Sequence, residues 1–414
     1  MLAHSMRLRL SVMMFLEFFL WGAWFVTLGS FLEWNLHASG AESALAYSTQ
    51  AWGAILAPFA VGLIADRYCR AERLLGWIHL AGGALLLALA RATDFGHFYP
   101  CLLAYMILFM PTLALVNAVA FRQMTAPARH FAGVRVWGTA GWIVAGLMIS
   151  FLFGWDSRGA LAEGALRNTF NLGAAASLLL GAYSFTLPAT PPLDLAHGPR
   201  TLASRMGLDA LGLLRERNYA VFFIASILIC IPLAFYYQDA NPFLTELHVA
   251  HATGKQTLGQ ASEVLFILLL PLFLVRFGMK ATLLTGMLAW ACRYSLFAAG
   301  NAHALEWMLL LGIALHGPCY DFFFVSGQIY TDERAGPARQ SSAQGLITLA
   351  TYGLGMLIGF SVAGAVTDAY RLAGRAMAHD WAMIWILPAA FALGVAALFV
   401  LAFRNERFAR VALS

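Results

Sequence analysis

Long apolar runs recur along the chain, separated by short polar segments that carry most of the charged residues. A helix that crosses the hydrocarbon core of a bilayer needs about 20 consecutive apolar residues. This length predicts twelve spanning helices, at residues 9–32, 44–65, 73–92, 97–121, 134–155, 168–187, 219–240, 259–276, 281–299, 304–327, 341–367 and 382–403. The first run is too long for a signal peptide and no small-residue cleavage site follows it, so we expect it to remain as a spanning helix.

Composition supports the same interpretation. Hydrophobic residues make up 61% of the 414 residues and charged residues 11%, whereas soluble globular proteins contain about 25% charged residues. A soluble enzyme and a nucleic-acid-binding protein are therefore excluded. The five cysteines are scattered and lack metal-ligand spacing, so we expect no disulfide framework, no metal site and no cofactor. The sequence predicts an all-α membrane protein.

Arginine and lysine are concentrated in alternate loops, where they outnumber those of the remaining loops about threefold. The positive-inside rule then places both termini in the cytoplasm. A proline-containing linker at residues 188–218 lies at the middle of the chain and separates six predicted helices from six. We expect a six-helix lobe at 1–187, a central cytoplasmic loop at 188–218 and a second six-helix lobe at 219–414, an arrangement typical of secondary transporters.

The loop after the second predicted helix has a recognisable pattern. Residues 62–70 (GLIADRYCR) resemble the Gly-x-x-x-Asp-Arg-x-x-Arg loop of the major facilitator superfamily, with Cys69 where glycine is usual. The resemblance implies an inner gate formed by Asp66, Arg67 and Arg70, and the alternative is an ordinary solvated loop.

Ionisable side chains at membrane depth are costly unless they face a cavity or a partner, so each one is a candidate functional group. Several share one helical face with other polar or aromatic side chains because they are three, four or seven residues apart. These groups are Arg135, Thr139 and Trp142; Gln260 and Glu263; His316 and Tyr320, with Asp321 beside them; and Glu17, Trp21 and Trp24. In the seventh helix, Tyr237 and Gln238 precede Pro242, and we expect this proline to open the outer end of the helix.

A cavity with such a lining suits a neutral, flat, polyhydroxylated solute, because carboxylate and amide groups bind hydroxyls and aromatic rings cover an apolar face. Structural alternatives remain open for some of these residues. We expect Arg293 to pair with a neighbouring helix and His79 to be a packing or interfacial residue. Glu17 either lines the cavity or makes an interhelical hydrogen bond, and Trp21 and Trp24 could form an ordinary packing stripe.

Segments spread over nearly the whole chain resemble the bacterial nucleoside–proton symporters, the nucleoside permeases of the major facilitator superfamily. The resemblance is carried by residues 18–30 (FFLWGAWFVTLGS), 110–117 (MPTLALVN), 135–141 (RVWGTAG), 262–268 (SEVLFIL), 320–323 (YDFF) and 342–345 (SAQG). It implies a major facilitator fold of twelve helices in two lobes that open alternately to each side. It also implies proton-driven nucleoside uptake across the bacterial inner membrane.

Individual residues match the positions that bind nucleoside in this family. Arg135 and Thr139 match, and Trp142 stands where the family has phenylalanine. Gln260 and Glu263 match the pair that binds ribose, and Tyr320 stands in place of a phenylalanine. Asp321 matches the aspartate that is linked to proton coupling in the family. This role suits an acid at membrane depth, because burial disfavours a charged carboxylate and so favours taking up a proton. Glu263 and Glu17 are further candidates for coupling.

The chain departs from the family on the side of the base. Ala234 and Tyr237 stand where the best-known members have Gln and Asn, His316 replaces a tyrosine, and Glu17 replaces a neutral glutamine. Tyr237, Gln238 and His316 are therefore new candidates for base contacts. The expected partners are a nucleoside, protons and membrane lipid, with the protein as a monomer. A transporter of a sugar or modified nucleoside, and a non-transporting membrane sensor, remain alternatives.

Overall fold

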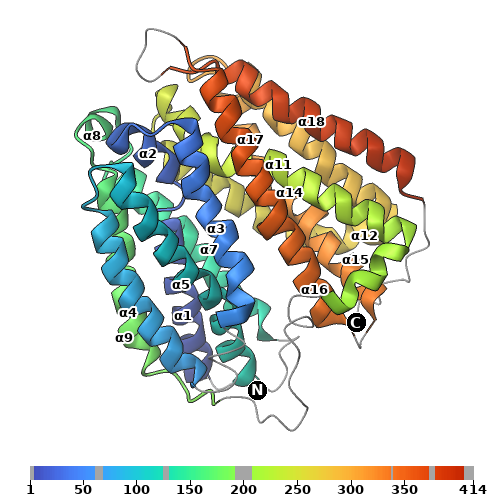
Figure 1. The fold of residues 1–414 in the computed structure, drawn as a ribbon, viewed down its shortest axis with the longest axis horizontal. Coiled ribbons are helices and arrows are strands. Elements are labelled where there is room, and N and C mark those ends of the chain that lie inside the picture. Colours follow the sequence, from blue (N-terminus) through green and yellow to red (C-terminus); the bar gives the residue numbers. More distant parts are fainter. Residues whose placement is uncertain are drawn as a thin grey trace. The chain divides into compact units, whose positions relative to one another are not determined.

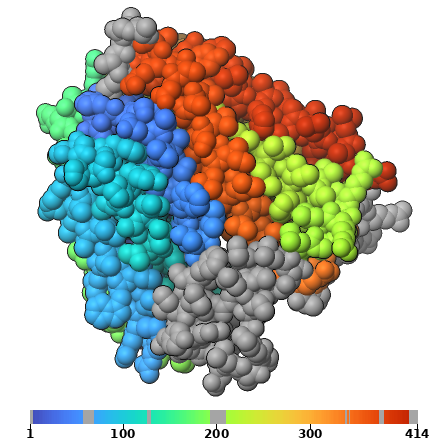
Figure 2. Space-filling view, in the orientation of Figure 1, coloured from blue at the N-terminus to red at the C-terminus, as the bar shows by residue number. Residues whose placement is uncertain are grey.

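The computed structural model describes residues 4–60, 69–124, 130–191, 208–336, 339–372 and 378–404. Within these ranges the chain is helical apart from turns, short loops and an isolated bridge between Arg371 and His379. The chain forms two compact units, each a bundle of helices (Figure 1). The first comprises Met1–Arg200 with Ala250–Thr257, and the second comprises Thr201–Val249 with Leu258–Ser414. In the space-filling view, side chains close the space between neighbouring helices within each unit (Figure 2).

In the first unit α1 packs against α7 and α9, while α5 packs against α3 and α4. Its elements are α1 (His4–Gly22), α2 (Leu28–Leu36), α3 (Gly40–Ala60), α4 (Ala71–Leu89), α5 (Phe95–Arg122), α7 (Ala132–Leu147), the π-helical segment η2 (Met148–Leu152), α8 (Arg158–Ala162) and α9 (Arg167–Ser184). The approach of α1 to α7 requires a glycine, because a Cβ atom at Gly141 would collide with the backbone carbonyl of Phe15. Asp94 caps α5 by accepting the His97 backbone N–H at 3.0 Å, and its hydrogen bonds to His97 hold the pKa of this carboxyl below its usual range.

The prediction of one continuous helix at 9–32 is wrong, since regular helix is interrupted at residues 23–27 between α1 and α2. Buried hydroxyls stabilise this turn. The Thr27 hydroxyl donates to the carbonyl of Trp24 at 3.1 Å, and the Tyr47 hydroxyl accepts the backbone N–H of Gly29 at 2.9 Å. The apolar run contains no proline that would have signalled the break.

A short segment from the second half of the sequence belongs to the first unit. Ala250–Thr257 is tied to η2 and the loop after it by buried hydrogen bonds. One carboxylate oxygen of Asp156 accepts both the Ser150 hydroxyl at 2.5 Å and the Thr253 backbone N–H at 2.9 Å. The Ser150 hydroxyl oxygen in turn accepts the backbone N–H of Gly254 at 2.6 Å. Asp156 and Ser150 together thus provide acceptors for two backbone N–H groups in the first turn of the helix that begins at Ala252, where such groups have no partner within the helix.

In the second unit α11 packs against α17 and α18. Its elements are the 3-10 helix η4 (Leu208–Arg215), α11 (Arg217–Glu246), α12 (Ala252–Ala299, whose first turns belong to the first unit), α13 (Glu306–Ala314), α14 (His316–Tyr320), η5 (Asp321–Val325), α15 (Ser326–Ala335), α16 (Gln340–Thr348), η6 (Leu349–Gly355), α17 (Met356–Ala369) and α18 (Trp381–Ala402). The backbone leaves helical geometry at Gly278 (φ 77°, ψ 173°), which divides α12 between the predicted helices at 259–276 and 281–299. Positive φ is accessible to glycine because it has no Cβ.

The expected opening of the seventh helix at Pro242 is also wrong. α11 runs without interruption to Glu246 and contains both Pro232 and Pro242. Neighbouring hydroxyls bind backbone carbonyls near the prolines, as is usual in membrane helices. The Thr245 hydroxyl lies 3.0 Å from the carbonyl oxygen of Asn241, and the Tyr294 hydroxyl donates to the carbonyl of Pro232.

Eight helices in the described ranges are long and apolar enough to cross a membrane. The first half of α12 presents exposed Leu265, Leu268, Leu272 and Val275, a stripe of large apolar side chains that suits contact with lipid. These features confirm an all-α membrane protein. The count of twelve spanning helices and the lobe limits at 187 and 219 stay predictions.

Candidate functional site

In the first unit, the predicted stripe on α7 lies against α1. The guanidinium carbon of Arg135 is 4.0 Å from the centroid of the Phe18 ring, a cation–π contact. Trp142 meets the Trp21 ring edge to face at 5.4 Å. Arg135, Thr139 and Trp142 are all partly exposed, so this stripe keeps polar atoms and an aromatic surface accessible.

Glu17 belongs to a different environment in the same unit. Its carboxylate is 0% exposed and has partners on two other helices. One oxygen accepts the Thr112 hydroxyl on α5 at 2.5 Å, and the other lies 2.9 Å from Nε2 of His79 on α4. Nδ1 of His79 is 3.3 Å from the hydroxyl of Ser177 on α9. Of the two roles left open for Glu17, the structure gives the interhelical one, and His79 is its buried partner.

In the second unit, the candidates on α11 point to two environments. Tyr237 is partly exposed, whereas Gln238 is buried and its amide donates to the Asp239 carboxylate at 3.3 Å. The same Asp239 oxygen accepts the hydroxyl of Thr367 on α17 at 3.3 Å. Gln238 is therefore part of a buried polar contact between α11 and α17.

Gln260 and Glu263 lie on one face of α12, and both are partly exposed. Next to them, the Ser262 hydroxyl donates to the backbone carbonyl of Ala314 at 2.5 Å. Gly317 leaves room for this contact, because a Cβ atom there would lie 2.7 Å from the Ser262 backbone. Close packing of α12 on α13 and α14 thus fixes the position from which Glu263 projects.

The remaining candidates follow one another along α14 and η5. His316 is buried, and its Nδ1 lies 3.1 Å from a terminal nitrogen of Arg293. The Tyr320 hydroxyl lies 2.6 Å from the hydroxyl of Tyr352 in η6. Asp321 is 0% exposed, and neither carboxylate oxygen has a hydrogen-bond partner among the described residues. Asp321 also opens a π-helical segment, a feature often found at functional sites.

Sequence reasoning missed Tyr352 altogether, because a single tyrosine inside an apolar helix gives no signal. It foresaw that Arg293 pairs with a neighbouring helix, but not with which residue. Arg293 lies in the second half of α12, with its guanidinium carbon 3.4 Å from the Tyr236 ring centroid, and it contacts a candidate base-binding residue, His316.

The inner-gate residues Asp66 and Arg67 lie outside the described residues. Arg70 is exposed and immediately precedes α4. Two residues later, the buried Glu72 accepts the backbone N–H of Thr190 at 2.8 Å, and the Ala71 N–H donates to the Thr190 carbonyl at 3.0 Å. The start of α4 is thereby joined to the chain that follows α9.

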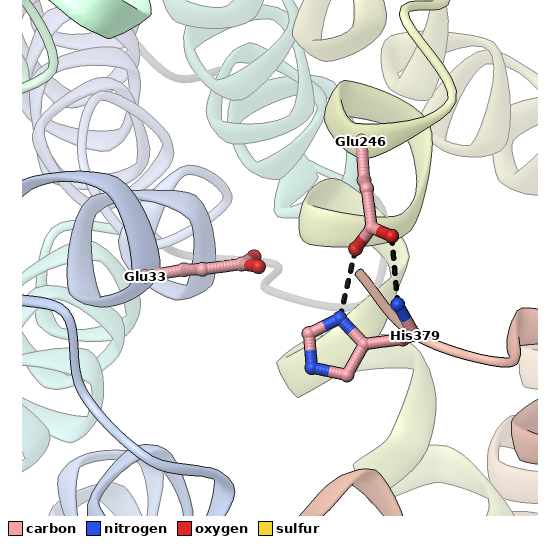
Figure 3. Close-up of side chains that lie close together, drawn as sticks. All are labelled: Glu33, Glu246 and His379. Carbon is pink, nitrogen blue, oxygen red and sulfur yellow. Dashed lines mark hydrogen bonds and ion pairs between the residues drawn. The ribbon is translucent and has the colours of Figure 1, made fainter. Parts of the chain in front are cut away.

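At the C-terminal end of α11, Glu246 and His379 form a two-point contact (Figure 3). The carboxylate accepts the backbone N–H of His379 at 2.8 Å, and its second oxygen lies 2.8 Å from the ring Nδ1. The pair ties the end of α11 to the residues that lead into α18.

Comparisons with known proteins match nearly the whole chain. The putative nucleoside transporter YegT of Escherichia coli (strain K12) is 41% identical, over 96% of this chain and 94% of its own length. The xanthosine permease of the same organism is 34% identical, over 97% of this chain and 96% of its own length. A crystal structure of the nucleoside transporter NupG has a TM-score of 0.86 at 29% identity, covering 97% of this chain and 100% of that one.

The family described as "Nucleoside H+ symporter" matches residues 4–407. This match covers both units, and the likeness to NupG establishes a transporter fold of the major facilitator type. The chain therefore belongs to the nucleoside H+ symporter family.

Proposed function

We propose that this protein takes up nucleosides together with protons across the bacterial inner membrane, by a mechanism in which the binding site opens alternately to each side. Support comes from the family match over residues 4–407 and from relatives named for nucleoside and xanthosine transport. The observation that carries the proposal is Asp321, a fully buried carboxyl group whose two oxygens have no hydrogen-bond partner among the described residues.

An unpartnered carboxyl group in an apolar interior is much less costly when it is protonated, because burial penalises the charged form. Asp321 is thus able to alternate between a neutral state that is stable when buried and a charged state that needs water or a partner. Opening of the site to water supplies that condition. In our proposal Asp321 takes up the proton on the outer side and releases it on the cytoplasmic side.

We assign the nucleoside contacts to partly exposed side chains, with the exception of Gln238 and His316, which are buried. Glu263 accepts hydrogen bonds from the ribose hydroxyls, with Gln260 beside it on the same face of α12. The remaining substrate-binding groups are Arg135, Thr139, Trp142, Tyr237, Gln238, His316 and Tyr320. Trp142 and the tyrosines supply aromatic surface for the base, and Arg135 supplies a fixed pair of donors.

The proposed arrangement in the membrane follows the charge pattern. Both termini lie in the cytoplasm, as does the loop at 188–218, and Asp66, Arg67 and Arg70 form the inner gate. The protein acts as a monomer surrounded by lipid.

Uptake of radiolabelled uridine into proteoliposomes tests the proposal. An acidic exterior is expected to drive accumulation, and a protonophore is expected to abolish accumulation without changing uridine binding. Accumulation that survives the protonophore and follows added sodium contradicts proton coupling. A panel of unlabelled sugars and nucleosides identifies the solute class, since only nucleosides are expected to compete.

A further inference from the structure

Arg293 is a fully buried cation in the second unit. Its guanidinium carbon lies 3.4 Å from the centroid of the Tyr236 ring, and one terminal nitrogen lies 3.1 Å from Nδ1 of His316. Two other guanidinium nitrogens, Nε and Nη2, have no hydrogen-bond partner among the described residues. A charged group at this depth is expensive to keep, so its contact with His316 calls for a functional account.

The contact determines which nitrogen of His316 carries a proton. A guanidinium has five N–H donors, no acceptor and no accessible neutral form, so Arg293 can only donate. Nδ1 of His316 must then be the acceptor and carry no proton. A neutral imidazole with a free Nδ1 lone pair carries its proton on Nε2. Arg293 therefore fixes His316 as a hydrogen-bond donor through Nε2.

The position of the His316 ring is fixed as well as its tautomer. It stacks on Tyr236 with centroids 5.3 Å apart and on Tyr320 with centroids 5.9 Å apart. Those two tyrosines adjoin Tyr237 and Asp321, which are residues of the proposed nucleoside and proton sites. In the described part of the chain Nε2 has no hydrogen-bond partner. A rigid, oriented N–H donor thus stands among the residues assigned to the base.

We propose that His316, positioned by Arg293, donates a hydrogen bond from Nε2 to a carbonyl oxygen of the nucleobase. This inference rests on the proposed function and deepens it, since it names the class of nucleoside. A carbonyl oxygen accepts the Nε2 proton, whereas an exocyclic amino group would place its own donors against it and leave both groups unsatisfied. Uridine is then preferred over cytidine, and inosine over adenosine, by about 5- to 100-fold in affinity. Arg293 acts as a positioning residue, and His316 contacts the base.

Calorimetric binding of these four nucleosides to the purified full-length protein tests the proposal. His316→Phe keeps a stacked ring but removes the donor, and Arg293→Gln releases the tautomer, so both substitutions are expected to reduce the uridine/cytidine and inosine/adenosine ratios towards one. Cys292→Ser changes an exposed neighbour of Arg293 and serves as the matched control with an unchanged ratio.

Nitrogen-15 NMR of labelled histidine tests directly whether Arg293 sets the tautomer of His316, while the affinity ratios test whether that tautomer selects the base. The wild-type protein is expected to show His316 protonated at Nε2, and Arg293→Gln is expected to show both tautomers. A proton on Nδ1 in the wild type overturns the proposal, as do equal affinities for all four nucleosides. Equal affinities leave the proposed function intact, whereas failure of every nucleoside to bind overturns the proposed function and base reading together.

Discussion

Among the described residues each unit has one carboxylate that is 0% exposed, Glu17 on α1 and Asp321 at the start of η5, and the two have opposite surroundings. One oxygen of Glu17 accepts the Thr112 hydroxyl at 2.5 Å, and the other lies 2.9 Å from the His79 imidazole. Neither oxygen of Asp321 has a hydrogen-bond partner among the described residues. Burial alone therefore does not identify a proton-carrying acid. What distinguishes the two is whether the fold already stabilises one protonation state.

The arginines repeat the contrast. Arg135 of the first unit is partly exposed above Phe18, where a solute could reach it. Arg293 of the second unit is fully buried behind Tyr236 and His316. A cation of the first kind can bind a solute directly, and one of the second kind acts through the side chains that it orients.

The largest effect is expected from Asp321→Asn. The amide keeps the shape of the side chain but cannot carry a proton, so accumulation against a gradient should disappear while uridine binding persists. Uphill uptake in proteoliposomes and calorimetry of the same preparation check both halves. Retained accumulation would show that another acid carries the proton, and Glu17→Gln under the same conditions identifies whether that acid is Glu17.

Glu263→Gln separates substrate binding from coupling within the second unit. Replacing a carboxylate by an amide weakens charge-assisted hydrogen bonds to the ribose hydroxyls, and we expect about 10- to 100-fold lower uridine affinity, or about 1.4–2.8 kcal/mol. Deoxyuridine provides the control, since loss of a hydroxyl should cost the wild type more affinity than it costs the variant. Wild-type affinity of Glu263→Gln would remove Glu263 from the ribose site.

Glu17 should respond as a structural residue. Glu17→Ala removes the buried carboxylate that contacts both Thr112 and His79, with an expected loss of about 1–3 kcal/mol of stability. The double variant Glu17→Leu with His79→Leu should recover much of that loss, because apolar packing can replace a buried polar pair. Thermal unfolding in detergent measures both. Equal stability of Glu17→Ala and the wild type, together with lost accumulation, would instead assign Glu17 to coupling.

The smallest effect is expected from Tyr320→Phe, which removes the 2.6 Å contact with the Tyr352 hydroxyl but keeps the ring. A single neutral hydrogen bond contributes about 0.5–1.5 kcal/mol, so uridine affinity should fall by no more than about tenfold. Tyr352→Phe breaks the same bond from the other side and should give the same change if the bond serves only to position Tyr320.

Much of the fold was predictable because spanning helices require long apolar runs, which the sequence displays directly. The breaks were less predictable. Regular helix stops at residues 23–27 although no proline lies in that run, and it continues through Pro242 although proline disfavours it. In both places side-chain hydroxyls from the same or a neighbouring helix bind the backbone, and such partners are decided by tertiary packing.

For the candidate site too, local groupings of residues were predictable from the sequence and long-range contacts were not. Helical spacing was enough to group Gln260 with Glu263 and His316 with Tyr320, because residues three or four positions apart share a helix face. It could not pair Glu17 with His79, which are 62 positions apart, or Tyr320 with Tyr352. Long-range polar partners are what separate a structural acid from a functional one, and these came only from the structure.

The segment Ala250–Thr257 limits where the chain can be cut into independent fragments. Because Asp156 and Ser150 hold its backbone, a fragment that ends in the linker at 188–218 would leave their buried oxygens without the N–H groups of Thr253 and Gly254. The sequence therefore does not separate into two self-sufficient pieces at its midpoint. Two co-expressed halves would have to reassemble through the contacts of the segment Ala250–Thr257. In a chimaera of two relatives, this segment would have to come from the same relative as the first half, which binds it.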